Sequence, residues 1–240
     1  MDYNNIIVEI RAGAGGDEAS LFCADLFQMY SRYAQKKNWK VFIIDSNQTT
    51  VGGFKEIVFE INGQNVYGEL KQESGVHRVQ RTPKTEKMGR VHTSTISVAI
   101  LPQVQDVEVK INPQDLKIGT TRSSGPGGQN VNKVETAVRI THIPSGLVVF
   151  CQTERAQAKN KEKALNLLRA KLFELKQQEQ TSQITAERRQ QIGTADRSEK
   201  IRTYNFPQNR ITDHRINKKW HNLDNILEGN MEPIIKAFKE

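Results

Sequence analysis

The sequence predicts an α+β fold made of two α/β units. Runs rich in β-branched residues, such as 6–10 and 94–101, alternate with two long segments whose apolar residues recur at helical spacing. The chain has 240 residues, enough for one large or two ordinary domains. Asn112-Pro113 is typical of a boundary between them. We therefore expect a mixed sheet with helices, then a smaller sheet with a long helix.

The first unit begins with a strand at 6–10 that runs into the glycine-rich turn 13–16. Asp17 is expected to cap the next helix, because apolar residues from Leu21 to Tyr33 follow at helical spacing. Further strands are expected at 41–45, 55–61, 66–71, 94–101 and 107–111. The dipeptide Asn62-Gly63 predicts a hairpin between two of them.

The second unit is expected to hold a hairpin of strands at 137–142 and 146–152, and residues 116–121 lead into the glycine-rich loop. A long helix is predicted from about Asn160 towards Arg189. Its part after Gln177 loses apolar periodicity, which predicts a solvated, frayed or RNA-contacting end. A basic connector follows Gly193, and a strand at 211–216 and two short helices finish the chain.

Composition favours an anionic partner. The formal net charge is +8 and the pI about 9.4, which indicates nucleic acid more than a membrane. The sequence shows no long apolar run and no targeting segment, so we expect a cytoplasmic protein without a membrane partner. Cys23 and Cys151 are interpreted as buried apolar residues of a reducing compartment. A catalytic Cys151 is the less favoured alternative.

The stretch from Arg122 to Lys133 is the most unusual in the chain. Gly125, Gly127 and Gly128 lack side chains, Pro126 restricts φ, and Gln129 is the functional side chain at the end. This composition is typical of a loop whose backbone lies close to something large and, given the flanking cations, phosphate-rich. A flexible surface turn is the alternative, and the spacing matches no phosphate-binding fingerprint.

A second stretch carries five cations at every third position, which are Arg78, Arg81, Lys84, Lys87 and Arg90. Pro83 and Gly89 prevent a helix there. Interleaved amide, hydroxyl and imidazole groups are of the kind that read unpaired bases, while cations hold the backbone. A solvated loop is the alternative.

These motifs together resemble class-I peptide chain release factors, which end translation by triggering hydrolysis of the peptidyl-tRNA ester. Besides Gly127-Gly128-Gln129, the resemblance runs through segments that span nearly the whole chain in the right order. They are RAGAGGDE at 11–18, GVHRVQR at 75–81, GRVHTS at 89–94, RTYNFP at 202–207 and TDHRIN at 212–217.

The resemblance implies how a stop codon is read. Pro83-Lys84-Thr85 fits the Pro-X-Thr motif of the type that responds to UAA and UAG. By the same resemblance, Thr85 contacts the first two bases and His92 stacks beneath the second. Gln80 and Thr93 face the third base, whereas Gly15 and Glu18 help to recognise the first uridine. The structural alternatives are a strand histidine for His92 and a first-turn helix acid for Glu18.

For the hydrolysis step, the sequence shows no catalytic triad and no metal-ligand spacing among its five histidines. We expect no metal and no cofactor. The resemblance implies that Gly127, Gly128 and Gln129 act inside the ribosomal peptidyl-transferase centre, with the Gln129 backbone N–H as a donor. It also implies N-methylation of Gln129 by a dedicated glutamine methyltransferase. The chain would promote hydrolysis only within the ribosome, not as a free-standing enzyme.

The implied domains are 1–112 for codon recognition, 113–200 for hydrolysis and 201–240 packing on the first. The implied partners are ribosomal RNA, the mRNA stop codon and peptidyl-tRNA, with the chain as a monomer. Family members carry a further helical domain before the first strand, and only five residues precede that strand here. The resemblance therefore does not imply the contact of that domain with a recycling GTPase. One alternative is a ribosome-rescue factor that shares Gly-Gly-Gln but lacks the segment 75–93. A free peptidyl-tRNA hydrolase would require a nucleophile–base pair that the sequence does not show.

Overall fold

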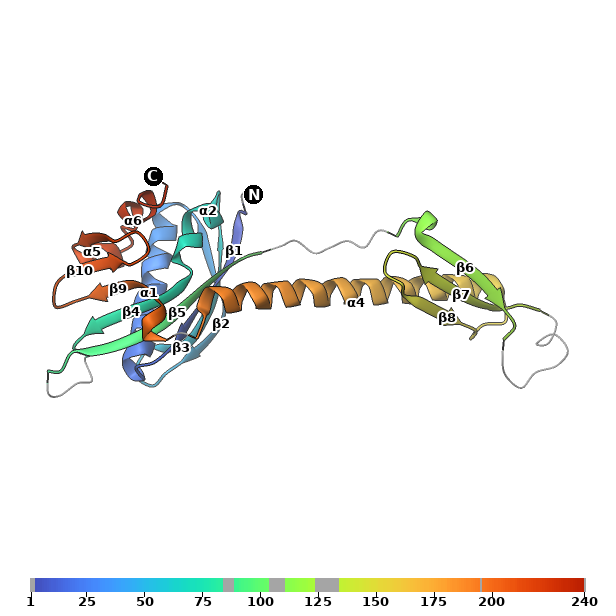
Figure 1. Ribbon diagram of the computed structural model, residues 1–240, viewed down its shortest axis with the longest axis horizontal. Coiled ribbons are helices and arrows are strands. Elements are labelled where there is room, and N and C mark those ends of the chain that lie inside the picture. The colour runs from blue at the N-terminus through green and yellow to red at the C-terminus, as the bar shows by residue number, and fades with distance from the viewer. Residues whose placement is uncertain (1–2, 84–88, 104–110, 124–133, 195, 240) are drawn as a thin grey trace. The chain divides into compact units, whose positions relative to one another are not determined.

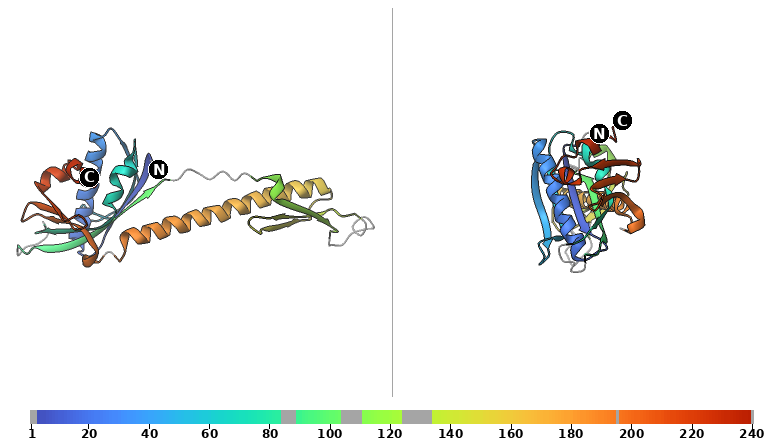
Figure 2. Two further views of the ribbon diagram at one scale, coloured as in Figure 1. Left: turned by 45° about the horizontal axis from the view of Figure 1, so that its top comes forward. Right: turned by 90° about the vertical axis from the view of Figure 1, so that its left-hand side faces the viewer.

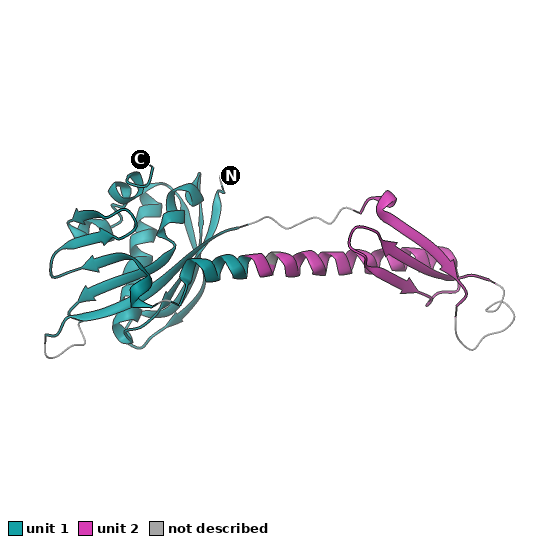
Figure 3. Cartoon of the chain, viewed as in Figure 1, with its two compact units in different colours: residues 1–104, 184–240 teal, residues 105–183 magenta. Residues whose placement is uncertain are grey.

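The computed structural model of the chain describes residues 3–83, 89–103, 111–123, 134–194 and 196–239 (Figure 1). It confirms the α+β class and contains two compact units (Figure 3). The first unit comprises residues 1–104 and 184–240, and the second comprises residues 105–183. The division thus falls before the predicted boundaries at 112 and 200, and the end of the long helix belongs to the first unit.

The first unit is built on an eight-stranded mixed sheet. Its strands are β1 (Asn5–Ala12), β2 (Lys40–Gln48), β3 (Phe54–Asn62), β4 (Gly75–Arg81), β5 (His92–Pro102), β9 (Lys200–Asn205), β10 (Arg210–Asp213) and β11 (Lys218–His221). Their order is β11-β10-β9-β4-β5-β1-β3-β2, with every described pairing antiparallel except β4 with β9. The C-terminal strands therefore complete the sheet, and β9 lies directly beside β4.

Helix α1 (Asp17–Lys36) covers one face of this sheet (Figures 1 and 2). Phe22, Leu26, Met29 and Tyr33 recur at helical spacing and are fully or almost fully buried against the strands. The short helices α5 (Leu223–Leu227) and α6 (Glu232–Lys236) add buried apolar residues to the same core.

The other face contacts the end of α4 (Gln157–Ile192). The Gln191 carboxamide makes two hydrogen bonds to the Ile100 backbone, of 2.9 and 3.0 Å, and Arg188 pairs with Glu9 of β1. The region expected to be solvated or frayed is therefore helical, and its last turns are fixed to the sheet.

Two local expectations are wrong. Residues 66–71 form no strand and no hairpin with 55–61; they form α2 (Val66–Leu70) and the start of the 3-10 turn η1 (Lys71–Glu73). Val66 and Leu70 lie one helical turn apart and are both buried. The second concerns the cap of α1. The capping residue is Gly16, with φ of 58°, whereas Asp17 is the first residue of the helix. Of the strand expected at 107–111, only Ile111 lies within the described residues.

The second unit has a three-stranded antiparallel sheet of β6 (Leu116–Thr121), β7 (Ala137–His142) and β8 (Val148–Cys151). The turn η2 (Pro113–Asp115) precedes it. A small apolar core joins one face of the sheet to α4 through Val138, Ile140, Val149, Cys151, Ala164, Leu168 and Leu172. Both cysteines are buried and free, as expected. In the described part of the chain, no helix is long and apolar enough to cross a membrane.

Candidate stop-codon and hydrolysis sites

The turn before α1 is fastened to the start of β5. The Gly13 backbone N–H donates to the Thr95 carbonyl at 2.8 Å, and the Ala14 N–H donates to Thr95 Oγ1 at 3.0 Å. At Gly15, a Cβ atom would lie 2.1 Å from Ser94 Oγ, and φ is +137°. Only glycine suits this approach. The turn that begins with Gly13 is thereby held next to Ser94 and Thr95.

Glu18 lies one turn into α1 and is buried, although it is a carboxylate. Its Oε1 accepts a hydrogen bond from Arg81 Nε at 2.5 Å, and Arg81 also contacts Asp25 at 2.6 Å. Burial raises the pKa of Glu18, and the Arg81 charge offsets only part of this. Glu18 Oε2 is buried without a hydrogen-bond partner among the described residues. The carboxylate is thus held by one oxygen, while the other remains an acceptor.

Arg81 itself is fixed from several sides. Its guanidinium carbon lies 5.8 Å from the centre of the Phe22 ring and 5.0 Å from that of Phe206. Arg78, another member of the cation run, donates to Thr203 Oγ1 at 3.1 Å, and that hydroxyl also bonds His214 at 2.7 Å. Two of the five cations therefore join elements of the fold, whereas Arg90 is exposed.

The predicted base-reading residues fall on two faces of the β4–β5 pair. Gln80 is directly opposite Thr93, and Arg81 is directly opposite His92. Because strand side chains alternate, the first pair lies on one face and the second on the other. The second pair shares its face with Glu18, since Arg81 binds Glu18 and His92 lies close enough to influence the Glu18 pKa.

Asn205 of β9 is a neighbour that sequence reasoning missed. Its Nδ2 donates to Gln80 Oε1 at 3.3 Å, and the Phe206 backbone N–H donates to the Gln80 carbonyl at 3.0 Å. Asn205 and Phe206 lie in the RTYNFP segment, whose pairing with β4 is not evident from local pattern. Pro83 is buried at the end of β4, whereas Lys84 and Thr85 lie outside the described residues.

A buried charge network lies on the α1 side of β4 and was also missed. Arg202 of β9 is fully buried and binds the Glu73 carboxylate with both terminal nitrogens, at 2.5 and 2.8 Å. It also contacts Asp213 at 3.2 Å. His77 of β4 bonds the Glu73 carbonyl at 2.8 Å. The network therefore connects η1, β9 and β10 through paired charges and β4 through a hydrogen bond.

Protonation in this network follows from burial and charge. Burial lowers the pKa of His77 to about 4, and the nearby Arg202 charge acts in the same direction. Burial alone would raise the pKa values of Glu73 and Asp213. Arg202 at Glu73, and Arg215 with Arg202 at Asp213, outweigh that effect and lower both. Neutral His77 and ionised carboxylates are thus the stable forms at neutral pH.

In the second unit, Gly127, Gly128 and Gln129 lie outside the described residues, but both ends of their segment are described. The segment joins β6 to β7, whose last pair is Thr121 with Ala137. Thr136 Oγ1 donates to Ser123 Oγ at 3.3 Å, across the base of the segment. Fully buried Asn160 of α4 donates to the carbonyls of Thr136 at 2.8 Å and Glu154 at 2.9 Å. The segment therefore begins and ends at a fixed base.

Within the described residues, no cluster of three His, Cys, Asp or Glu side chains is arranged to hold a metal ion.

Comparisons with known proteins agree with this arrangement. Residues 1–98 match the PCRF domain family, and residues 105–215 match the RF-1 domain family. Peptide chain release factor 1 of Acetivibrio thermocellus is 59% identical over 99% of this chain and 66% of its own length. That of Thermoanaerobacter pseudethanolicus is 58% identical over 99% of this chain and 67% of its own length.

A solved structure, RF2 of Thermus thermophilus, is 36% identical, with a TM-score of 0.60, and the match covers 100% of this chain and 70% of that one. The chain spans slightly less than two thirds of the length of relatives such as that of Acetivibrio thermocellus. The chain matches two domain families in sequence order. It also has a high identity to these relatives along nearly its whole length and shares its fold with a solved release factor. The chain belongs to the peptide chain release factor family.

Proposed function

We propose that this chain is a translation termination factor that recognises UAA and UAG in the ribosomal A site. It then triggers hydrolysis of peptidyl-tRNA in the peptidyl-transferase centre. The relatives named peptide chain release factor 1 support this reading. They do not favour a rescue factor without codon reading, which the segment 75–93 also argues against.

The observation that carries the proposal is the division of polar groups between two faces at the ends of β4 and β5. Gln80 and Thr93 are opposite neighbours on one face, and His92 is on the face that also holds Glu18. An imidazole on one side and an amide–hydroxyl pair on the other suit a codon whose third base is separated from its first two.

Each group has a role that its chemistry permits. Glu18 helps to recognise the first uridine together with the Gly15 backbone and nearby groups. Thr85 contacts the first two bases, and His92 stacks beneath the second. At the third base, a hydroxyl and a carboxamide can donate or accept, so both A and G are tolerated. Pro83 and Lys84 complete the reading segment.

In the hydrolysis step, water adds to the ester carbonyl and the tRNA 3′ oxygen leaves with a proton. Gly127 and Gly128 allow the backbone to approach closely, and the Gln129 N–H donates to the developing oxyanion or to the leaving oxygen. The Gln129 side chain admits water and excludes larger nucleophiles. The ribosome supplies the remaining surroundings, so the chain alone is not an enzyme.

The proposed partners are ribosomal RNA, the mRNA stop codon, peptidyl-tRNA and a glutamine methyltransferase that modifies Gln129. The chain acts as a monomer in the cytoplasm, and we do not propose a recycling GTPase as a partner. The net charge of the chain, +8, supports an RNA-rich partner.

The test is peptide release from ribosomes programmed with UAA, UAG, UGA or a sense codon. We expect release on UAA and UAG and little on the other two. Thr85→Ala should weaken stop-codon-dependent binding by about 1–3 kcal/mol, the scale of a lost base-edge contact. Equal release on UGA, or none on any stop codon, would contradict the assignment.

A further inference from the structure

The three-stranded sheet of the second unit has one face that α4 does not cover. Val138, Ile140 and Val149 point to the α4 side and are buried there. Their neighbours alternate to the opposite face, where Val148 is 40% and Phe150 48% exposed. In Figures 1 and 2 the helix lies along a single face of these strands.

Strand register gathers three different groups in one row across that outer face. Gly119 of β6 is opposite Arg139 of β7, and Arg139 is opposite Phe150 of β8. Directly opposite side chains on neighbouring strands are in contact range. A Cβ atom added at Gly119 would meet nothing within 4 Å, so the row is open at this end. The neighbouring row holds Lys117, Thr141 and Val148.

The charge of this face is not compensated by acids on it. Its outward positions on β6, β7 and β8 hold Lys117 and Arg139 but no Asp or Glu. Among the described residues, neither cation forms an ion pair, and Phe150 makes no ring–ring or cation–ring contact. Phe150 is therefore exposed on the same face as two cations that have no ion-pair partner among the described residues.

We propose that this outer face binds an unpaired stretch of RNA. The phosphates contact Arg139 and Lys117, one base stacks on Phe150, and the bare backbone at Gly119 leaves room for the ribose. Charge favours RNA over a protein partner, because the apolar area consists of Phe150 and Val148 while the cations have no local counterion. The inference goes beyond codon reading, since none of these residues lies in the first unit.

The experiment uses the full chain and a short unpaired oligoribonucleotide that contains 2-aminopurine. Stacking of this base on an aromatic ring quenches its fluorescence, whereas purely ionic binding does not. We expect Phe150→Leu to bind at least about fivefold more weakly, the lower end for one base–aromatic stack, and to lose the quenching. Phe150→Tyr should retain both. Arg139→Gln should reduce the slope of log K against log salt by about one.

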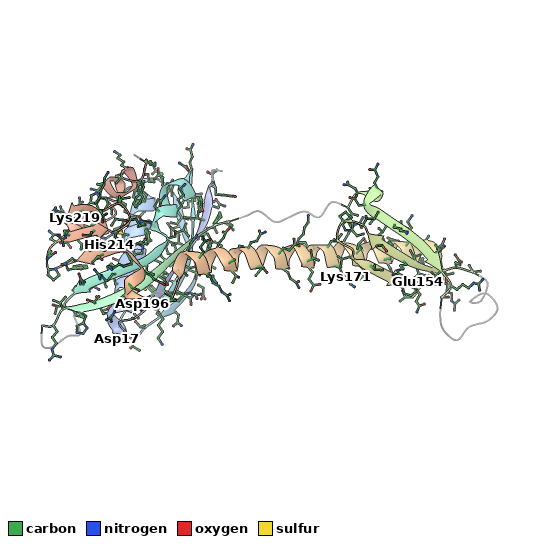
Figure 4. The ribbon with its side chains drawn as sticks, in the orientation of Figure 1. Asp17, Glu154, Lys171, Asp196, His214 and Lys219 are labelled. Carbon is green, nitrogen blue, oxygen red and sulfur yellow. The ribbon has the colours of Figure 1, made fainter. Side chains whose placement is uncertain are left out.

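Matched controls exist in the same unit. Phe173→Leu removes an equally exposed ring, at 49%, from α4, and it should leave binding and quenching unchanged. Lys171→Gln, also on α4 (Figure 4), should leave the quenching unchanged. A thermal melt checks that Phe150→Leu is folded, which is expected because the core lies on the opposite face.

Quenching and affinity that survive Phe150→Leu would overturn the proposal. So would sedimentation data in which the parent self-associates, Phe150→Leu abolishes that association, and RNA binding is unchanged. Codon selectivity is measured separately by peptide release, so failure of the termination assignment and failure of this inference give different results.

Discussion

Each unit contains a fully buried polar side chain that ties its elements together, and the two differ in charge. Arg202 of the first unit joins η1, β9 and β10 through two carboxylates. Asn160 of the second unit joins α4 to the ends of β7 and β8 through neutral hydrogen bonds. A buried charge is costly to leave unpaired, whereas an unpaired amide partner costs less. The stability of the first unit therefore depends more strongly on its buried partners than that of the second unit.

The largest effect should come from Arg202→Met, which leaves Glu73 buried without a charged partner and Asp213 with Arg215 alone. We expect a loss of about 3–5 kcal/mol in the free energy of unfolding. Both tryptophans, Trp39 and Trp220, lie in the first unit, so their fluorescence during urea unfolding reports on that unit alone.

Exposed Arg197→Met is the matched control for this change and should be close to neutral. Adding Glu73→Gln to Arg202→Met should recover part of the loss, because the uncompensated Glu73 charge is removed. A loss of less than about 1 kcal/mol for Arg202→Met would show that the buried charges are paired in another way.

In the second unit, the proposed role of the glycine segment depends on its backbone rather than on buried charges. Gln129→Pro should lower the release rate by about 10²–10³-fold while codon-dependent binding survives, because proline has no N–H to donate. Gln129→Ala keeps that N–H and should retain substantial hydrolysis. Single-turnover release at saturating factor measures the difference. If both variants are equally inactive, the side chain is the chemical participant.

Acid should lower the stability of the first unit through its buried titratable groups. Since the pKa of His77 is about 4 when folded and 6.5 as its ordinary value, the unfolded chain binds a proton that the folded chain does not. The contribution of His77 to the free energy of unfolding is fully present above pH 6.5. It falls by up to about 3 kcal/mol as the pH drops towards 4. Protonation of Glu73 and Asp213 adds to the loss at still lower pH, since both pKa values are lowered.

Urea unfolding followed by tryptophan fluorescence between pH 4 and 6.5 measures this slope. His77→Gln should flatten it, whereas His221→Gln, at an exposed position, should not. An unchanged slope in His77→Gln would assign the acid sensitivity to the carboxylates alone.

The smallest effect is expected from Asn160→Ala. It leaves the Thr136 carbonyl and the Glu154 backbone groups without their partner, which costs about 1–3 kcal/mol. Hydrogen exchange of the β7 and β8 amides should increase, while tryptophan fluorescence is unaffected. Asn166→Ala, at an exposed position of the same helix, is the control. Faster exchange in the first unit as well would mean that the two units do not unfold separately.

Apolar spacing in the sequence correctly predicts the long elements of the fold. Helix α1 and the body of α4 have apolar residues at helical spacing, and β5 has a long buried run. The short helix α2 was mistaken for a strand because Asn62-Gly63 resembles a hairpin turn and five residues show too little periodicity. The sequence predicts Asp17 as the cap of α1, whereas Gly16 is the cap and Asp17 is the first helical residue. The sequence does not show which of the neighbouring glycines adopts the positive φ that precedes the helix.

The sites divide in the same way. The resemblance supplied Gly15, Glu18, Gln80, His92 and Thr93 as residues that read the codon, and these roles remain predictions. The partners Arg81 and Asn205, and the network around Arg202, depend on pairings between distant segments. The parallel register of β4 with β9 joins residues more than a hundred positions apart, and no local pattern encodes it.

The position of β9 also has a consequence for biosynthesis. The outer neighbour of β4 is made only after the whole second unit, so during synthesis β4 has an open edge. Roughly 100 residues separate the end of β5 from β9, which corresponds to roughly 5–20 s at ordinary elongation rates. Until then Glu73 and His77 lack Arg202 and Tyr204. A nascent chain of this protein therefore completes the sheet around β4 last, and a chain interrupted before residue 200 never completes it.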